Sequence, residues 1–230
     1  MKSDSGKRFK DNKKTDFFIR NCRTYLIDYP SEFEILNMVL QNPDNPIFDA
    51  NNPPVREIVH AQIAAMGREL TEKQFEQAYQ RISDLYELKA IIFTEEIAAI
   101  AEEIYIQPEK GWDLVSLKTF IGPTVLPAAN VVLKTPTGEK ITSEGAGYSS
   151  TDAIFSAIGQ ATGIRVFLKD FNFSMISGGA NSLGQASMTI EYHNRQVRVK
   201  ACSIDMLEAA AKAYLIAINI VLDRIYQQLE

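Results

Sequence analysis

The stretch Leu126-Pro-Ala-Ala-Asn-Val-Val-Leu-Lys134 opens a pattern that the chain repeats: extended segments separated by a turn, then a helical segment that begins at an aspartate. From Trp112 to the end of the chain, this unit of three short strands and a helix occurs twice. A unit of this kind cannot bury its apolar face alone, so we expect the two copies to pack on each other or on a second chain. The expected fold class is α+β, with an N-terminal helical segment followed by a tandem βββα repeat. The matching segments are 126–134 with 184–191, 140–144 with 196–200, and 152–158 with 205–211.

Three regions of the chain differ in pattern. Residues 1–30 are predicted to form a basic flexible tail and a short helix that ends at Pro30, because the tail is too polar to repay the entropy of folding. Residues 31–108 are predicted to form a helical, linker-like subdomain. After Pro108 the hydrophobic period changes from helical to alternating, which predicts an α+β regulatory and dimerisation domain at 109–230.

Helix boundaries in the first half carry recognisable signals. A serine or threonine followed three residues later by glutamate or glutamine satisfies two free amides at a helix start, and a glycine past the last apolar position favours a helix end. The expected signals are capping boxes at Ser31-Glu-Phe-Glu34 and Thr71-Glu-Lys-Gln74, an N-cap at Thr94, and a helix end at Gly67 after the stripe that begins at Val55.

The last predicted helix, 205–229, is apolar on two sides. Such a helix is buried on two sides, here against the sheet and against another helix or a subunit. A central helix within a monomer is the alternative. One stripe comprises Met206, Ala210, Ala213, Ala217, Ile220 and Val221, and the other comprises Leu215, Ile218, Leu222, Ile225 and Leu229.

Composition excludes several classes of function. A net charge of −5 and the lack of a basic, aromatic-rich stretch argue against a nucleic-acid partner. Cys22 and Cys202 form no Cys-x-x-Cys pair or disulfide framework, and no apolar run suits a signal peptide or a membrane span. We therefore expect a soluble protein of the reducing cytoplasm, without a membrane partner.

The region from about Pro54 to Val221 resembles the C-terminal part of 2-isopropylmalate synthase and citramalate synthase, where a small helical subdomain leads into an allosteric domain. The motifs keep the order found in that family. They are Met66-Gly-Arg-Glu-Leu70, the phrase at 108–117, Gly145-Ala-Gly147 before Asp152-Ala153, Asp170-Phe171, the segment Gly179 to Gly184, and Ala209-Ala-Ala-Lys-Ala-Tyr214 with Asn219.

The resemblance implies a regulatory site for a branched-chain amino acid such as leucine, held between paired regulatory domains. Backbone N–H groups at the Gly145 and Gly147 turn would bind the carboxylate at a helix start. Asp152 would accept from the ammonium group or, alternatively, cap that helix. Leu168 and Phe171 would supply apolar walls or simply strand core. The full expected set is Gly145, Gly147, Thr151, Asp152, Leu168, Phe171, Gly179, Asn181 and Ser182.

The catalytic barrel of that family and its His-x-His metal motif have no counterpart in this sequence. His60 and His193 lack a second histidine at ligand spacing, so we expect no catalytic residue, metal or cofactor. The leading hypothesis is a non-catalytic regulatory homodimer that binds a small amino acid and acts on a separate catalytic barrel subunit. The alternatives are a scaffold that kept the fold but lost ligand binding, and one subunit of a split acyl-transferring synthase.

Overall fold

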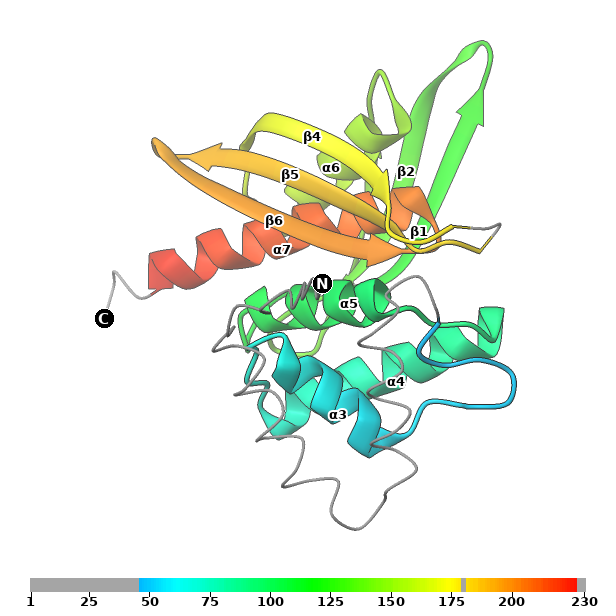
Figure 1. Ribbon diagram of the computed structural model, residues 1–230. Coiled ribbons are helices and arrows are strands. Elements are labelled where there is room, and N and C mark those ends of the chain that lie inside the picture. The colour runs from blue at the N-terminus through cyan, green and yellow to red at the C-terminus, as the bar shows by residue number, and fades with distance from the viewer. Residues whose placement is uncertain (1–45, 179–180, 227–230) are drawn as a thin grey trace, which may run out of the picture.

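Two βββα units follow a set of helices in the computed structural model, which describes residues 46–178 and 181–226 (Figure 1). The α+β class and the tandem βββα arrangement are thereby confirmed. The predictions for residues 1–30 and for the Ser31 capping box lie outside the described residues. The elements are α3 (Arg56–Ala65), α4 (Glu72–Lys89), α5 (Thr94–Ile106), β1 (Asp113–Gly122), β2 (Val125–Lys134), β3 (Lys140–Ala146), α6 (Ser150–Thr162), β4 (Phe167–Met175), β5 (Gly184–Tyr192), β6 (Arg195–Ser203) and α7 (Met206–Tyr226).

Each βββα unit is an antiparallel three-stranded sheet in sequential order, with the unit's helix on one face. Residues alternate between the two faces of a strand, so one side of β2 is buried and the other is not. Helix α6 packs on β2 and β3, α7 packs on β5 and β6, and the two helices pack on each other. One continuous core therefore joins the units, as expected from the first of the two packing alternatives. Its central strand residues are Ala129, Val131, Leu133, Ala186, Met188, Ile190, Val197, Val199 and Ala201.

Helix α7 is surrounded within its own chain. Its neighbours are β5, β6, α6 and β1, and every described residue from Ala209 to Asn219 except Lys212 is buried. The sheet and a second helix thus account for the two apolar stripes, and no subunit contact is needed to explain them. Leu229, at the end of one stripe, lies outside the described residues.

Helices α3, α4 and α5 form a second core. The Thr71 capping box is confirmed: Gln74 N donates to Thr71 Oγ1 and Thr71 N donates to Gln74 Oε1. The predicted end of α3 at Gly67 is also correct, since Gly67 has a φ of +71°. The prediction of Thr94 as an N-cap is wrong. Phe93 holds that position, and its N–H is satisfied by the Glu96 carboxylate instead.

The helical core continues onto the second sheet. Leu183 and Cys202 belong to the same apolar cluster as α3, α4 and α5, and α5 packs across β6. None of the helices in the described ranges is long and apolar enough to cross a membrane.

Candidate functional site

The Gly145 to Gly147 turn ends β3 and leads into α6. A Cβ on Gly145 would overlap the Ala153 carbonyl oxygen and the Ala157 amide and would lie 2.9 Å from Ala157 Cα. A Cβ on Gly147 would lie 2.7 Å from Ala153 N. Both glycines therefore allow α6 to approach β3 closely. The Gly147 N–H donates to the Pro127 carbonyl at 3.1 Å, so this amide already has an acceptor.

The start of α6 is the more open part of the predicted site. Ser149 is the N-cap, and its Oγ accepts from the Asp152 N–H at 3.1 Å and lies 2.9 Å from Thr151 Oγ1. Asp152 is therefore not the cap, and its side chain is exposed in the first helical turn. The capping role of Ser149 was missed, although a serine three residues before an aspartate is a recognised signal. Among the described residues, the N–H groups of Ser150 and Thr151 have no hydrogen-bond acceptor.

The two predicted apolar walls lie on β4. Leu168 and Phe171 are half-buried and pack against the shared core. The ring of Phe171 meets the ring of Phe155 edge to face, at 5.7 Å between centroids, and Phe155 stacks on Tyr214 at 4.4 Å. Because Phe155 lies about one turn after Asp152 on α6, Phe171 lies near the first turn of that helix.

The second predicted loop contacts the helical unit. The Ser182 hydroxyl donates to the Ser177 carbonyl oxygen, and the Ser177 hydroxyl donates to Glu96 Oε1 at 2.6 Å. Glu96 is fully buried and forms an ion pair of 2.5 Å with Lys89. Asn181 is exposed, and Gly179 lies outside the described residues. Ser182 thus holds Ser177, and Ser177 anchors the loop to α5.

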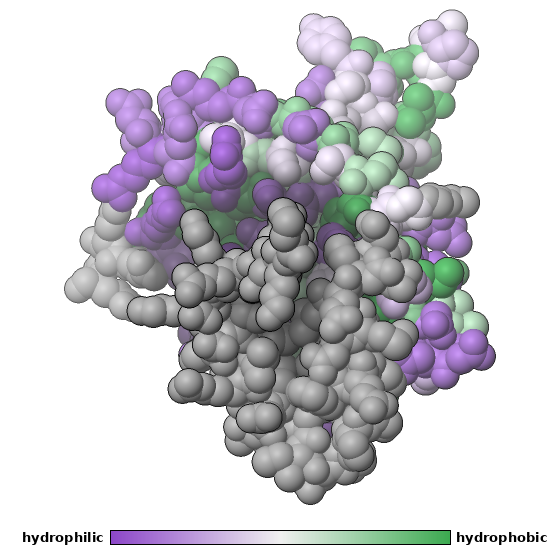
Figure 2. Space-filling view, in the orientation of Figure 1, coloured by the Kyte–Doolittle hydropathy of each residue, from purple (hydrophilic) through white to green (hydrophobic). Residues whose placement is uncertain are grey.

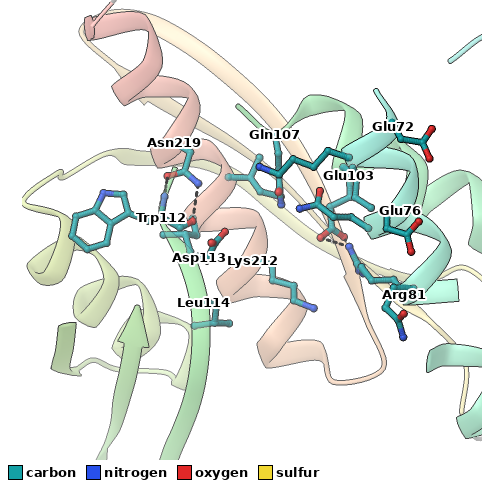
Figure 3. A pocket seen from close by; sticks show the side chains of 16 residues that line it. Glu72, Glu76, Arg81, Glu103, Gln107, Trp112, Asp113, Leu114, Lys212 and Asn219 are labelled. Atoms are coloured by element: carbon teal, nitrogen blue, oxygen red, sulfur yellow. Dashed lines mark hydrogen bonds and ion pairs between the residues drawn. The ribbon is translucent and has the colours of Figure 1, made fainter. Parts of the chain in front are cut away.

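A cleft of about 890 Å³ lies between α4, α5, β1 and α7 (Figure 3). One of its charged groups is Glu103, which is buried on α5 among mainly apolar residues. Arg81 donates to both Glu103 oxygens, at 2.7 and 3.2 Å, and to the Cys202 carbonyl at 3.0 Å. The Cys202 N–H donates to Glu103 Oε2 at 2.7 Å. This cluster joins α4, α5 and β6.

Burial and charge act together on the groups of this cluster. Burial opposes the charge on Arg81, but the Glu103 carboxylate outweighs it and raises the pKa of the guanidinium. Burial, reinforced by the same carboxylate, raises the pKa of the Cys202 thiol. The cysteine is therefore a protonated, unreactive thiol at neutral pH. This cluster was not among the predicted residues, although a glutamate within the apolar stripe of a predicted helix was a usable signal.

At the far end of the cleft, the side chain of Asn219 forms two hydrogen bonds with the backbone of Trp112, and this pair of bonds is called the clamp below. Asn219 on α7 accepts from the Trp112 N–H and donates to the Trp112 carbonyl, both at 2.9 Å (Figure 3). Gly111 is required beside it, because a Cβ there would lie 2.7 Å from Asn219 Cγ. Since the charges of Arg81 and Glu103 neutralise each other, we interpret the cleft as part of the packing interface, here called the joint, between the helices α4 and α5 and the second βββα unit. Within the described ranges, no group of three or more potential ligand side chains could hold a metal ion.

Comparison with known proteins supplies the remaining observation. The model of the LeuA allosteric (dimerisation) domain family matches residues 91–222. A 2-isopropylmalate synthase from Sediminispirochaeta smaragdinae is 32% identical over 150 residues, which is 65% of this chain and 30% of that protein. One from Dictyoglomus turgidum is 28% identical over 197 residues, which is 84% of this chain and 39% of that protein. The chain thus spans between 30% and 39% of the length of these relatives.

Proposed function

Because this chain belongs to the LeuA allosteric (dimerisation) domain family, we propose that it binds a small branched-chain amino acid or similar effector and regulates a catalytic barrel carried by a separate subunit. The observation that carries this proposal is the extent of the family match, which includes α5 and both complete sheets and reaches well into α7. Regulation and dimerisation are the functions of this family. We propose four further points: that the chain binds an effector, that the barrel is a separate subunit, that the chain together with the barrel condenses acyl groups, and that both are located in the cytoplasm.

The start of α6 supports the effector site. The N–H groups of Ser150 and Thr151 lie at the positive end of the helix dipole, where a carboxylate is stabilised. The exposed Asp152 carboxylate in the same turn suits an ammonium group. A recess of about 390 Å³ next to Gly145 is lined by Phe120 and Ala128 together with the polar Asn130, Glu144 and Gln160, and its apolar part offers a surface for the effector's side chain.

Calorimetric titration of the full chain with leucine, isoleucine and valine tests the effector. At about 100 times its dissociation constant, a ligand stabilises the fold by about 2.7 kcal/mol, which a thermal shift detects. We expect Asp152→Asn to weaken binding and Asp170→Asn, an exposed change on β4, to leave it unaltered. No heat and no thermal shift with any of the three amino acids would exclude the effector.

One observation favours a scaffold that has lost ligand binding. Gly145 and Gly147 are already explained by the packing of α6, and the Gly147 amide is already bonded to Pro127. Mixing the full chain with a 2-isopropylmalate synthase barrel separates the hypotheses. A scaffold binds the barrel without any amino-acid effect, a regulator changes condensation only when the effector is present, and a split synthase restores condensation that neither chain has alone.

A further inference from the structure

One face of the first sheet has no neighbour among the described residues. Helix α6 covers the inner face of β1, β2 and β3, and the register places at least three cross-strand rows on the outer face. The first row is apolar, the second is charged at its ends, and the third is uncharged. The rows are Phe120, Ala128 and Ala146; Lys118, Asn130 and Glu144; and Ser116, Val132 and Thr142.

The turn at the end of this sheet is also unusually apolar. Phe120, Ile121, Val125 and Leu126 are between 59% and 66% exposed, and Tyr148 in the adjacent turn is 94% exposed. Figure 2 shows hydrophobic residues along this projecting hairpin. Contiguous exposed apolar residues of this kind mark contact surfaces on soluble proteins.

The second βββα unit provides an internal comparison. Its outer face is mostly hydrophilic, with Lys169, Asn172, Ser187 and Arg198 at exposed or half-buried positions and with Phe167 as an exposed apolar residue at one end (Figure 2). Its own β4 to β5 loop is not free, because Ser177 bonds to Glu96 on α5. The second unit thus has a hydrogen-bonded loop and a mostly hydrophilic outer face. The first unit has an exposed apolar loop and a partly apolar outer face. This difference points to a partner for the first unit alone.

The outer face of the first sheet is complementary to itself. A two-fold axis parallel to β2, running between two stacked copies, places β1 of one copy over β3 of the other and β2 over β2. Phe120 then faces Ala146 of the partner subunit, which combines a large side chain with a small one. Lys118 faces Glu144 of the partner subunit, so opposite charges meet twice. Isologous interfaces need this reciprocity of residue pairs.

We propose that the outer face of β1, β2 and β3, with the apolar hairpin end, is the surface on which a second copy of this chain docks in a face-to-face, two-fold dimer. The proposal rests on the dimerisation function stated above and names its surface.

The size of the face indicates which residues must take part. Ten residues of β2 span about 34 Å, and three strands about 14 Å, so the flat face measures about 480 Å². Stable interfaces bury about 800 Å² on each partner. The sheet face alone is too small, and Ile121, Val125, Leu126 and Tyr148 must extend it.

Sedimentation of the full chain across the micromolar range tests the surface. We expect Phe120→Asp to raise the dimer dissociation constant by more than about tenfold, and Ser174→Asp, at the corresponding edge of β4, to leave it unchanged. Lys118→Glu and Glu144→Lys should each weaken the dimer by about tenfold through repulsion. The double variant should return to within about threefold of the wild type, because the swapped charges attract again. Circular dichroism establishes that each variant is folded.

The outcomes separate the surface from dimerisation itself. A monomeric wild type would overturn both. A dimer that tolerates Phe120→Asp and both charge reversals would overturn the surface and leave dimerisation standing. Weakening by both single reversals without recovery in the double variant would overturn the two-fold pairing of Lys118 with Glu144.

Discussion

Replacing Gly145 with alanine tests how closely α6 packs on β3. The new Cβ would lie 2.9 Å from Ala157 Cα and closer still to two backbone atoms of α6, whereas ordinary contacts begin at 3.4 Å. Restoring that separation from Ala157 Cα alone requires α6 to move by about 0.5 Å, since its backbone cannot rotate away as a side chain can. The movement loosens the buried residues that α6 contributes to the core, which are Ala153, Ile154, Phe155, Ala157 and Ile158.

Overpacking of this kind costs about 1–3 kcal/mol, and we expect about 3 kcal/mol here because the obstacle is backbone. For a chain of this length, that loss lowers the melting temperature by about 6–12 °C. Urea denaturation and calorimetry at one fixed protein concentration measure both quantities. Gly178→Ala is the matched control, since a Cβ there meets nothing within 4 Å. A Gly145→Ala variant within about 0.5 kcal/mol of the wild type would refute the close packing.

Three further predictions concern the joint between the helices and the second unit. Arg81→Met should cost about 3–5 kcal/mol in urea, because it leaves a buried carboxylate unpaired, whereas Arg56→Met, at an exposed ion pair, should leave the midpoint unchanged; equal losses would contradict the joint. In a Cys22→Ser background, Cys202 should react with a thiol reagent only after unfolding, and rapid reaction of the native protein would contradict its burial. Because the pKa of Cys202 is raised in the folded state, the thiol of the unfolded chain ionises first, and the free energy of unfolding should fall as the pH rises above about 8.5. Asn219→Ala should cost about 2 kcal/mol by leaving the Trp112 amide and carbonyl without partners, and an unchanged denaturation midpoint would contradict that clamp.

Local patterns predicted the elements because their causes are local. Alternation in β2, the Thr71 capping box and the positive φ at Gly67 each depend on residues a few positions apart. The docking of the helices on β6 depends on Arg81 and Glu103 reaching Cys202, which is 121 and 99 residues away in the sequence. No periodicity within one sequence encodes such a pairing.

In the candidate site, too, local patterns were predicted from the sequence and long-range contacts were not. Gly145 and Gly147 were predicted to form a turn that presents backbone N–H groups at a helix start, and the structure shows in addition that a Cβ would not fit at either position. What the missing side chain makes room for depends on the residue opposite, which is Ala157 of α6 for Gly145. Ser182 was grouped with them from its turn-forming neighbours, but its hydroxyl bonds to Ser177, which in turn bonds to Glu96 of α5. Glycine and serine patterns locate turns, and only the tertiary structure assigns each turn a neighbour.

Because of the joint at Arg81, the parts that pack together are not the parts that follow one another in the chain. The helical unit precedes β1 in sequence, yet its buried polar contacts reach β6 and the loop before β5. The first βββα unit packs on the remainder chiefly through α7. The packing route from the Gly147 turn to α4 and α5 therefore runs through α6, α7 and then β6. The close-packed alanines of α7 leave little free volume along that route in which a small shift could be absorbed.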